Sequence, residues 1–389
     1  MPDEIRITDL TDPVLTDTQK AALDYCDGLD IDLDRESILA DARKRADLDD
    51  FGADDFLRRL DLLIAEWRAD SGLTGLGRLS LRNKLVQHAT SRLLIHGTLT
   101  AHPEIREIPI EKPIIVAGLP RSGTTHLLNL MAADSRLRSL PLWESYEPVP
   151  IAGEQPLDDG TDPRYKRCAD TWAVMKQTTP YLAAMHPMEP DHIHEELELM
   201  GPDFASYNYE WLSHSPRWRD DYYAHDQTPH YEYMKDVLRL LLWQQRDTDR
   251  PTRWVLKCPQ HLEQLPVLKK VFPDATVAIT HRDPVSVIQS AATMLAYGQR
   301  LNRRRVEASA LIEYWSDRVE HLLRACFDDR DTWPDENSID VLFHEFMADD
   351  LAMVERIYER AGLPMTDTAR SELARYIDEH PRGKEGRVV

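Results

Sequence analysis

The sequence has few cysteines and no long apolar run. Its 389 residues include four cysteines, and no two of them have the C-x-x-C spacing of a zinc or redox site. No run approaches the roughly 18 apolar residues of a membrane-spanning helix. The opening residues MPDEIRITDL lack the basic and apolar segments of a signal peptide. We therefore expect a cytoplasmic protein with free thiols and no integral membrane segment.

Basic residues are also in short supply. Lysine and arginine number 47 against 68 acidic residues, which gives a formal net charge of −21. A nucleic-acid partner is therefore not expected, because a phosphate backbone requires a basic face. A small anionic ligand stays compatible with this charge, because local basic side chains can override the global sign.

The chain changes character near residue 109. In residues 1–108, apolar residues recur at three- and four-residue spacing, which predicts a helical N-terminal region. Beyond it, the β-branched run EKPIIVAG and runs at 253–257, 275–282 and 339–346 alternate with helical stretches. This alternation predicts that residues 109–389 form an α/β domain, with a parallel sheet flanked by helices on both faces.

Residues 140–250 are rich in aromatic side chains. They hold 5 of the 9 tryptophans and 9 of the 14 tyrosines, in clusters such as SYNYEW and HYEYM. Two interpretations are open. The rings pack helices together, or they line a pocket for a bulky acceptor molecule.

The stretch VAGLPRSGTTHLLNLM, residues 116–131, has the glycine spacing of a phosphate-binding loop (P-loop). Gly118 and Gly123 match G-x-x-x-x-G-K-[ST], but Thr124 stands where the lysine belongs. A strand, a glycine turn and a helix still direct free backbone N–H groups at an anion. Arg121 adds a guanidinium that can bind two oxygens at once. The missing lysine disfavours nucleoside triphosphate chemistry, whereas a 5′-phosphate can bind here without a metal.

A second motif, HRDPVSVIQS, follows an apolar strand. Arg282 ends that strand, and Ser290 lies eight residues later, about two helical turns further on. The carboxyl edge of an open α/β sheet is where ligands bind, so both side chains are candidates for anion binding. The alternative is an ion pair of Arg282 and Asp283 at the surface.

These two motifs together resemble the sulfotransferase superfamily that uses 3′-phosphoadenosine 5′-phosphosulfate (PAPS). The segments WVLKCPQHL, FPDATVAITHRDP and HPRGKEGR resemble its bacterial branch, and the resemblance covers roughly residues 112–387. It implies a P-loop fold and an EC 2.8.2 type enzyme with PAPS as the donor cosubstrate and no required metal. It also implies donor-binding roles for Arg121, Ser122, Gly123, Thr124, Thr125, His126, Arg282, Ser290, Arg382, Gly383 and Lys384. His126 stands where relatives often have tryptophan, so helix packing is a further role for it.

The resemblance also implies catalytic roles. Lys257 ends the strand in WVLK and matches a lysine close to the bridging oxygen of the donor. Two residues are candidates for the general base that an acceptor hydroxyl requires. Glu144, in LPLWESY, takes the place of a catalytic glutamate in several relatives. His261 follows Lys257 by four residues, whereas the cytosolic family has its histidine two residues on.

The segment HPMEPDHIHEELELM raises the question of a metal. It contains His186, His192, His194, Glu195 and Glu196, but not the H-E-x-x-H pattern. Zinc binding is an alternative, and we favour an amphipathic helix beginning at the glutamates, near the acceptor. The expected partner is a small-molecule or glycolipid-like hydroxyl acceptor, and a homodimer is possible. A P-loop nucleotide kinase or a non-catalytic nucleotide-binding module is the alternative function.

We expect the protein to bind adenosine 3′,5′-bisphosphate without magnesium and more tightly than 5′-AMP. Arg282→Ala should remove this preference, because one hydrogen bond to a charged group contributes roughly 1.5–3 kcal/mol, at least about tenfold in affinity. Calorimetric titration with the two nucleotides measures the effect. Equal affinity of the wild type for both would contradict the assignment.

Overall fold

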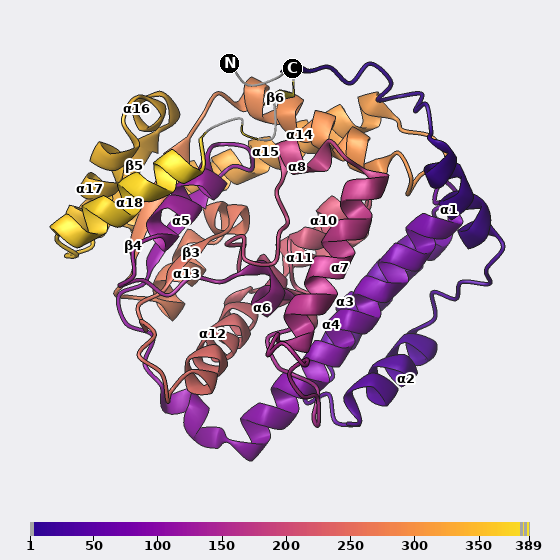
Figure 1. Ribbon diagram of the computed structural model, residues 1–389, viewed down its shortest axis with the longest axis horizontal. Coiled ribbons are helices and arrows are strands. Elements are labelled where there is room, and N and C mark those ends of the chain that lie inside the picture. The colour runs from indigo at the N-terminus through magenta and orange to yellow at the C-terminus, as the bar shows by residue number, and fades with distance from the viewer. Residues whose placement is uncertain (1–3, 382–383, 385–386, 389) are drawn as a thin grey trace.

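The computed structural model describes residues 4–381, 384, 387 and 388, and it is a mixed α/β fold (Figure 1). Four parallel strands form the main sheet in the order β3-β2-β4-β5. Their bounds are Ile114–Gly118 (β2), Val255–Lys257 (β3), Thr276–His281 (β4) and Ser338–Leu342 (β5). The predicted parallel sheet is confirmed.

One predicted strand is too long. The run 339–346 leaves the sheet after Leu342 and continues as helix α16, Phe343–Ala348. Phe343 and Phe346 are three residues apart, which is close to one helical turn. Phe346 is fully buried, whereas Phe343 is partly exposed. An apolar run of this kind does not distinguish a strand from a strand followed by a helix.

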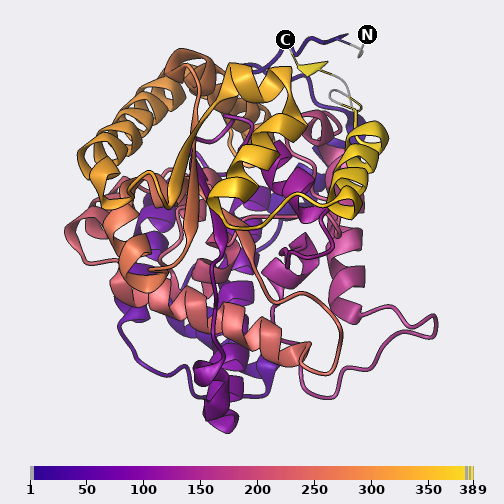
Figure 2. The same cartoon turned by 90° about the vertical axis from the view of Figure 1, so that its left-hand side faces the viewer.

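The two faces of the main sheet pack into two separate hydrophobic cores. Ile114 and Val116 of β2 pack with helices α5 (Thr124–Ala132), α17 (Asp350–Arg360) and α18 (Asp367–Glu379). Ile115 and Ala117 point the other way, into the larger core. This alternation is the period of a strand buried on both faces, and Figure 2 shows the C-terminal helices in front of the sheet. The prediction of helices on both faces is confirmed.

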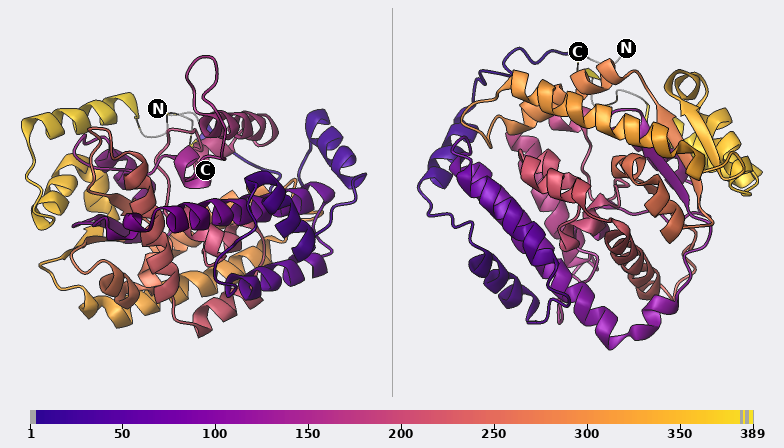
Figure 3. Two further views of the ribbon diagram at one scale, coloured as in Figure 1. Left: turned by 90° about the horizontal axis from the view of Figure 1, so that it is seen from below. Right: turned by 180° about the vertical axis from the view of Figure 1, so that it is seen from behind.

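The N-terminal region is helical, apart from one short strand. Four helices and a 3₁₀ turn precede the sheet, and the long α4 crosses the molecule (Figures 1 and 3). A strand that the sequence did not predict, β1 (Glu4–Ile5), pairs in parallel with β6 (Arg387–Val388) and brings the two ends of the chain together. A strand of two residues shows no periodic pattern in the sequence, so β1 is recognised only from its pairing with β6. The helices are α1 (Asp17–Asp27), α2 (Arg35–Ala46), α3 (Phe56–Ala69), α4 (Gly75–Ala101) and the turn η1 (Pro103–Glu107).

After α5, helices of varied length connect β2 to β3. They are α6 (Leu142–Tyr146), α7 (Pro163–Thr178), α8 (Leu182–Met185), α9 (Leu197–Met200), η2 (Gly201–Asp203), α10 (Asn208–Leu212), α11 (Pro216–Ala224) and α12 (Thr228–Gln244). The rest of the chain adds η3 (Pro259–Glu263), α13 (Leu265–Val271), α14 (Pro284–Gln299), α15 (Ala308–Asp329) and η4 (Arg330–Thr332). No helix in the described part of the chain is both long and apolar enough to cross a bilayer.

A buried ionic cluster anchors the turn that follows β3. Arg318 of α15 is fully buried and forms ion pairs with Glu210 of α10 at 2.9 Å and Glu263 of η3 at 2.6 Å. Because η3 begins two residues after Lys257, this cluster holds the carboxyl end of β3 against α15.

Arg318→Met is expected to destabilise the protein by about 3–5 kcal/mol, because it leaves two buried carboxylates without their cation. Urea unfolding at neutral pH measures the loss. Arg324→Met on the same helix is the control, since its exposed pair with Glu320 contributes at most about 0.5 kcal/mol. Similar losses in the two variants would contradict this account of the cluster.

Candidate active site

The loop between β2 and α5 is a strained turn that opens a helix. Arg121 has a φ of 64° and Gly123 a φ of 85°, both in the left-handed region. Such a backbone is uncommon for a residue with a side chain and is concentrated at functional sites. Ser122 donates to the Leu119 carbonyl at 2.6 Å and bonds Thr280 of β4 at 2.7 Å. No side chain caps α5, so its first N–H groups stay available to an anion.

The two sequence motifs meet at this loop. The guanidinium of Arg282 donates a hydrogen bond to the carbonyl oxygen of Arg121. Arg121 in turn donates from Nε to Ser290 Oγ at 3.0 Å and from Nη1 to the Met185 carbonyl at 2.5 Å. Burial, and then the neighbouring charge of Arg282, lower the pKa of Arg121 from its ordinary value. Among the described residues, neither arginine forms a direct ion pair with a carboxylate, and the charge of Asp283 acts on Arg282 from the neighbouring position.

Lys257 reaches the same loop from β3. Its ammonium lies 3.3 Å from Thr125 Oγ1 and forms an ion pair with Glu195. The strand order explains this meeting, because β3 and β4 lie on opposite sides of β2. The ends of the three strands therefore share one carboxyl edge, at the switch point where α/β sheets bind ligands.

The two residues predicted as the general base lie elsewhere. Glu144 is buried against Arg138 at 2.5 Å, and the Arg138 guanidinium covers the ring of Trp254, which precedes β3 at its amino end. His261 is fully buried, with Nε2 at 2.6 Å from Glu196 and Nδ1 at 2.9 Å from the Tyr231 hydroxyl. Neither side chain lines the cavity beside the loop.

The remaining predicted donor-binding residues are dispersed. His126 faces α17, with Nε2 at 3.1 Å from Asp350 and its ring 5.5 Å from the Phe346 ring. Lys384 is exposed and donates to the Glu379 carbonyl at 3.4 Å. Arg382 and Gly383 lie outside the described residues.

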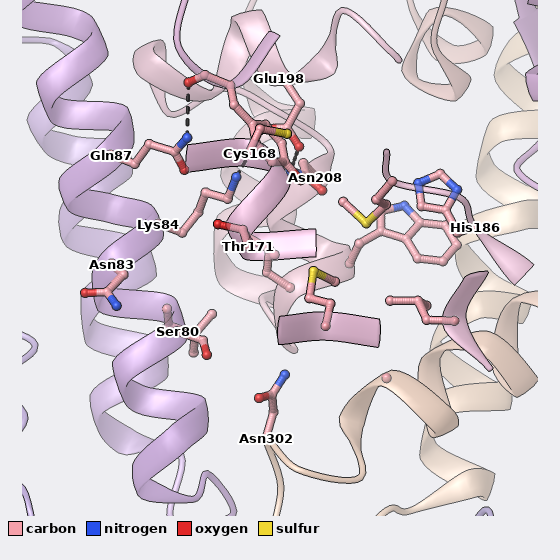
Figure 4. Close-up of a pocket in the computed structure, with 18 of the residues that line it drawn as sticks. Ser80, Asn83, Lys84, Gln87, Cys168, Thr171, His186, Glu198, Asn208 and Asn302 are labelled. Carbon is pink, nitrogen blue, oxygen red and sulfur yellow. Dashed lines mark hydrogen bonds and ion pairs between the residues drawn. The ribbon is translucent and has the colours of Figure 1, made fainter. Parts of the chain in front are cut away.

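A cavity of about 1290 Å³ opens beside the loop. Arg121, Thr124, Thr125 and Lys257 line one side of it, and α4, α7 and the end of α14 line the others. In Figure 4, Ser80, Asn83, Lys84 and Gln87 project from α4 on one side, and His186 lies on the opposite side. Apolar side chains on the wall include Leu76, Val174, Met175, Trp211, Leu212 and Met294. The cavity therefore joins the loop to a wall that the N-terminal region supplies.

Charged groups deep in this wall are paired. Lys84 lies 3.4 Å from Glu198, and Asn208 donates to the same carboxylate at 2.7 Å. Burial opposes ionisation of Glu198, but Lys84 and His88 outweigh it and lower its pKa to about 2. At the cavity edge, Arg45 pairs with Glu147 at 3.3 Å.

The histidine-rich segment contributes His186, Met188, His194 and Glu195 to the cavity wall. Glu195 and Glu196 are engaged by Lys257 and His261, respectively. The helix here, α9, begins only at Leu197. Burial lowers the pKa of His194 to about 3 and that of His186 well below its ordinary value, so both rings are neutral at neutral pH. Sequence reasoning noticed these residues but did not place Glu195 beside Lys257.

Residues 113–367 match the model of a family described as the sulfotransferase family. The chain belongs to the sulfotransferase family. It superimposes on the crystal structure of sulfotransferase STF1 from Mycobacterium tuberculosis H37Rv with a TM-score of 0.76 and 29% identity, covering 89% of this chain and 94% of that chain. For sulfotransferase STF9 from Mycobacterium avium, the TM-score is 0.80 and the identity 25%, covering 93% and 94%. No curated protein matches the chain significantly.

These two structures extend the likeness beyond the family segment. The STF9 alignment covers 93% of this chain, which is more than residues 113–367 and the C-terminal residues together. Part of the helical N-terminal region therefore superimposes as well. The resemblance that the two sequence motifs carry is therefore confirmed at the level of the family.

Gly118→Ala is expected to distort the loop of this sulfotransferase. A Cβ at Gly118 would lie 1.8 Å from Thr280 Oγ1 and 2.8 Å from Thr124 Cγ2. We expect a loss of about 1–3 kcal/mol in the free energy of unfolding. We also expect a higher dissociation constant for adenosine 3′,5′-bisphosphate. Urea unfolding and calorimetry measure the two effects.

Gly298→Ala is the matched control. Gly298 lies in α14, and a Cβ there has no atom within 4 Å. This variant is expected to gain up to about 1 kcal/mol in stability. If Gly118→Ala behaved like Gly298→Ala, the close packing under the loop would have no functional role.

Proposed function

We propose that this sulfotransferase transfers a sulfuryl group from PAPS to a hydroxyl of a small or lipid-like acceptor. The observation that carries the proposal is the convergence of Arg121, Arg282 and Ser290 at the free N-terminus of α5. Two guanidiniums without a direct ion pair, together with a helix N-terminus, suit a ligand with several anionic groups.

The donor's two anionic ends have separate places in this proposal. The backbone N–H groups of Gly123, Thr124 and Thr125 and the two threonine hydroxyls hold the 5′-phosphosulfate. Ser122 shapes the loop through its hydrogen bonds to Leu119 and Thr280. Arg282 and Ser290 hold the 3′-phosphate, and Arg121 lies between the two groups. The absent P-loop lysine disfavours a nucleoside triphosphate as the ligand, because in nucleoside triphosphatases that lysine binds the β- and γ-phosphates.

Lys257 is the proposed stabiliser of the leaving group. Bound PAPS supplies a sulfuryl group whose transfer leaves negative charge on the 5′-phosphate oxygen. An ammonium fixed within hydrogen-bond range of the loop hydroxyl of Thr125 is positioned to stabilise that charge. Its side chain is only 2% exposed, so water screens the interaction little.

The cavity supports an acceptor that is largely apolar. Its wall combines leucine, methionine and valine side chains with neutral polar groups such as Ser80 and Asn83, and charged residues deep in the wall, such as Lys84 and Glu198, are paired. Most of the aromatic clusters do not face it: Tyr207, Tyr209 and Tyr231 are buried in the core, whereas Trp211 lines the cavity. This arrangement favours the helix-packing interpretation for most of the aromatic residues.

A reducing cytoplasm is the proposed setting. All four cysteines are buried and unpaired, which suits a protein that is not exposed to disulfide-forming conditions.

The proposal is tested by incubating the protein with ³⁵S-labelled PAPS and a panel of phenols, sterols, glycolipids and sugars, in EDTA. We expect labelled product from at least one hydroxyl compound and no gain from added magnesium. Magnesium-dependent ATP turnover without sulfate transfer would identify a kinase instead. Nucleotide binding without transfer to any compound would favour a binding module.

A further inference from the structure

Lys257 lies between two partners that belong to different halves of the proposed reaction. On one side its ammonium is 3.3 Å from Thr125 Oγ1 in the donor loop. On the other it forms an ion pair with Glu195, which lines the acceptor cavity. The same cation therefore contacts the place for the donor phosphate and a carboxylate on the acceptor side.

Within the described part of the chain, Lys257 is the one cationic partner of Glu195, an acid of the cavity wall. Among the described residues, no other donor binds its side chain. Burial raises the pKa of Glu195 above its ordinary value, and the ion pair with Lys257 offsets only part of that shift. A buried carboxylate with a raised pKa accepts a proton more readily than an exposed one.

We propose that Glu195 is the general base for the acceptor hydroxyl and that Lys257 restrains it until the donor binds. This inference rests on the proposed function. In the free protein the ion pair holds the carboxylate. The anionic donor draws the ammonium toward the loop, and Glu195 is then free to accept a hydrogen bond from the acceptor.

The chemical step balances with these two groups. The acceptor oxygen forms a bond to sulfur, and the bond between sulfur and the 5′-phosphate oxygen breaks, leaving its electron pair on that oxygen. Glu195 takes the hydroxyl proton, and Lys257 stabilises the new phosphate charge. The products are a sulfate ester, adenosine 3′,5′-bisphosphate and one proton, which passes from Glu195 to solvent.

Other titratable groups face the same space. They are Lys257 from β3, Arg121 from the loop, His186 after α8, and His194, Glu196 and Glu198 from the segment of Glu195 itself. Glu196 is committed to His261, and Glu198 to Lys84. Burial lowers the pKa of His186 well below its ordinary value, which makes its neutral ring a weak base. His186 is nevertheless the competing candidate and belongs in the test.

The binding test uses calorimetry with adenosine 3′,5′-bisphosphate and requires no acceptor. Glu195→Gln frees Lys257 and is expected to lower the dissociation constant at least about threefold. Lys257→Met is expected to raise it, and adding Glu195→Gln in that background is expected to change little. Glu198→Gln is the matched control, a buried acid of the same cavity that is paired with Lys84. An equal gain from both glutamate variants, or a gain that persists without Lys257, would overturn the restraint by Lys257.

The kinetic test uses PAPS and the acceptor that gives the largest turnover in the panel. Glu195→Gln is expected to lower kcat by about 100-fold or more, without raising the KM for PAPS, and to remove the acid limb of the pH profile. His186→Asn is expected to keep kcat within about tenfold. If Glu195→Gln does not fold, Glu195→Asp replaces it, with an expected intermediate kcat.

Near wild-type kcat in the Glu195 variant, or the large loss in His186→Asn instead, would overturn the assignment of the base. Failure of the wild type to bind the bisphosphate, or to transfer sulfate at all, is a different result. It would overturn the proposed function and would be seen before any Glu195 variant is measured.

Discussion

The hydrogen bond from the Arg282 guanidinium to the Arg121 carbonyl connects the parts of the site. Arg121 is held at a φ of 64°, a conformation that costs energy for any residue with a Cβ. The bond from β4 stabilises that turn, and the turn directs Arg121 Nε to Ser290. These two contacts tie the loop after β2 to the strand end and the helix that follow 161 and 169 residues later.

The second constraint is how charge is distributed around the loop. Deep in the cavity the cations are matched by acids, as Lys84 is by Glu198. At the loop, Arg121 and Arg282 form no direct ion pair with a described acid, and only the charge of the neighbouring Asp283 acts on Arg282. An overall acidic protein therefore keeps unbalanced positive charge at one place, and a low-dielectric wall strengthens its attraction for an anion.

The sequence allowed the elements of the sheet edge to be predicted because their signals are local. Gly118, Gly123 and the apolar strands reveal the loop, and Lys257 and Arg282 are recognised as strand ends from the runs that precede them. The parallel arrangement then places all of these at one edge. Glu195 was not assigned, since its partner Lys257 lies 62 residues away and only the tertiary fold brings the two side chains together.

Other features depended on chain directions that no local pattern specifies. Arg138 forms a β-bridge with Trp254 at the amino end of β3, and this contact sets the direction of the turn before Glu144. As a result, the Glu144 carboxylate forms an ion pair with Arg138. Part of the cavity wall comes from α4, whose lining residues precede the loop by more than 30 positions, because this long helix runs along the cavity. Its polar residues Ser80 and Asn83 look, in sequence, like an ordinary solvated helix face.

The most direct measurement of the central claim is a crystal structure with adenosine 3′,5′-bisphosphate, grown without magnesium. We predict the 5′-phosphate at the N–H groups of residues 123–125, the 3′-phosphate within hydrogen-bond distance of Arg282 and Ser290, and Lys257 turned from Glu195 toward the loop. A nucleotide bound away from Arg282, or reversed so that its 3′-phosphate occupies the loop, would contradict it.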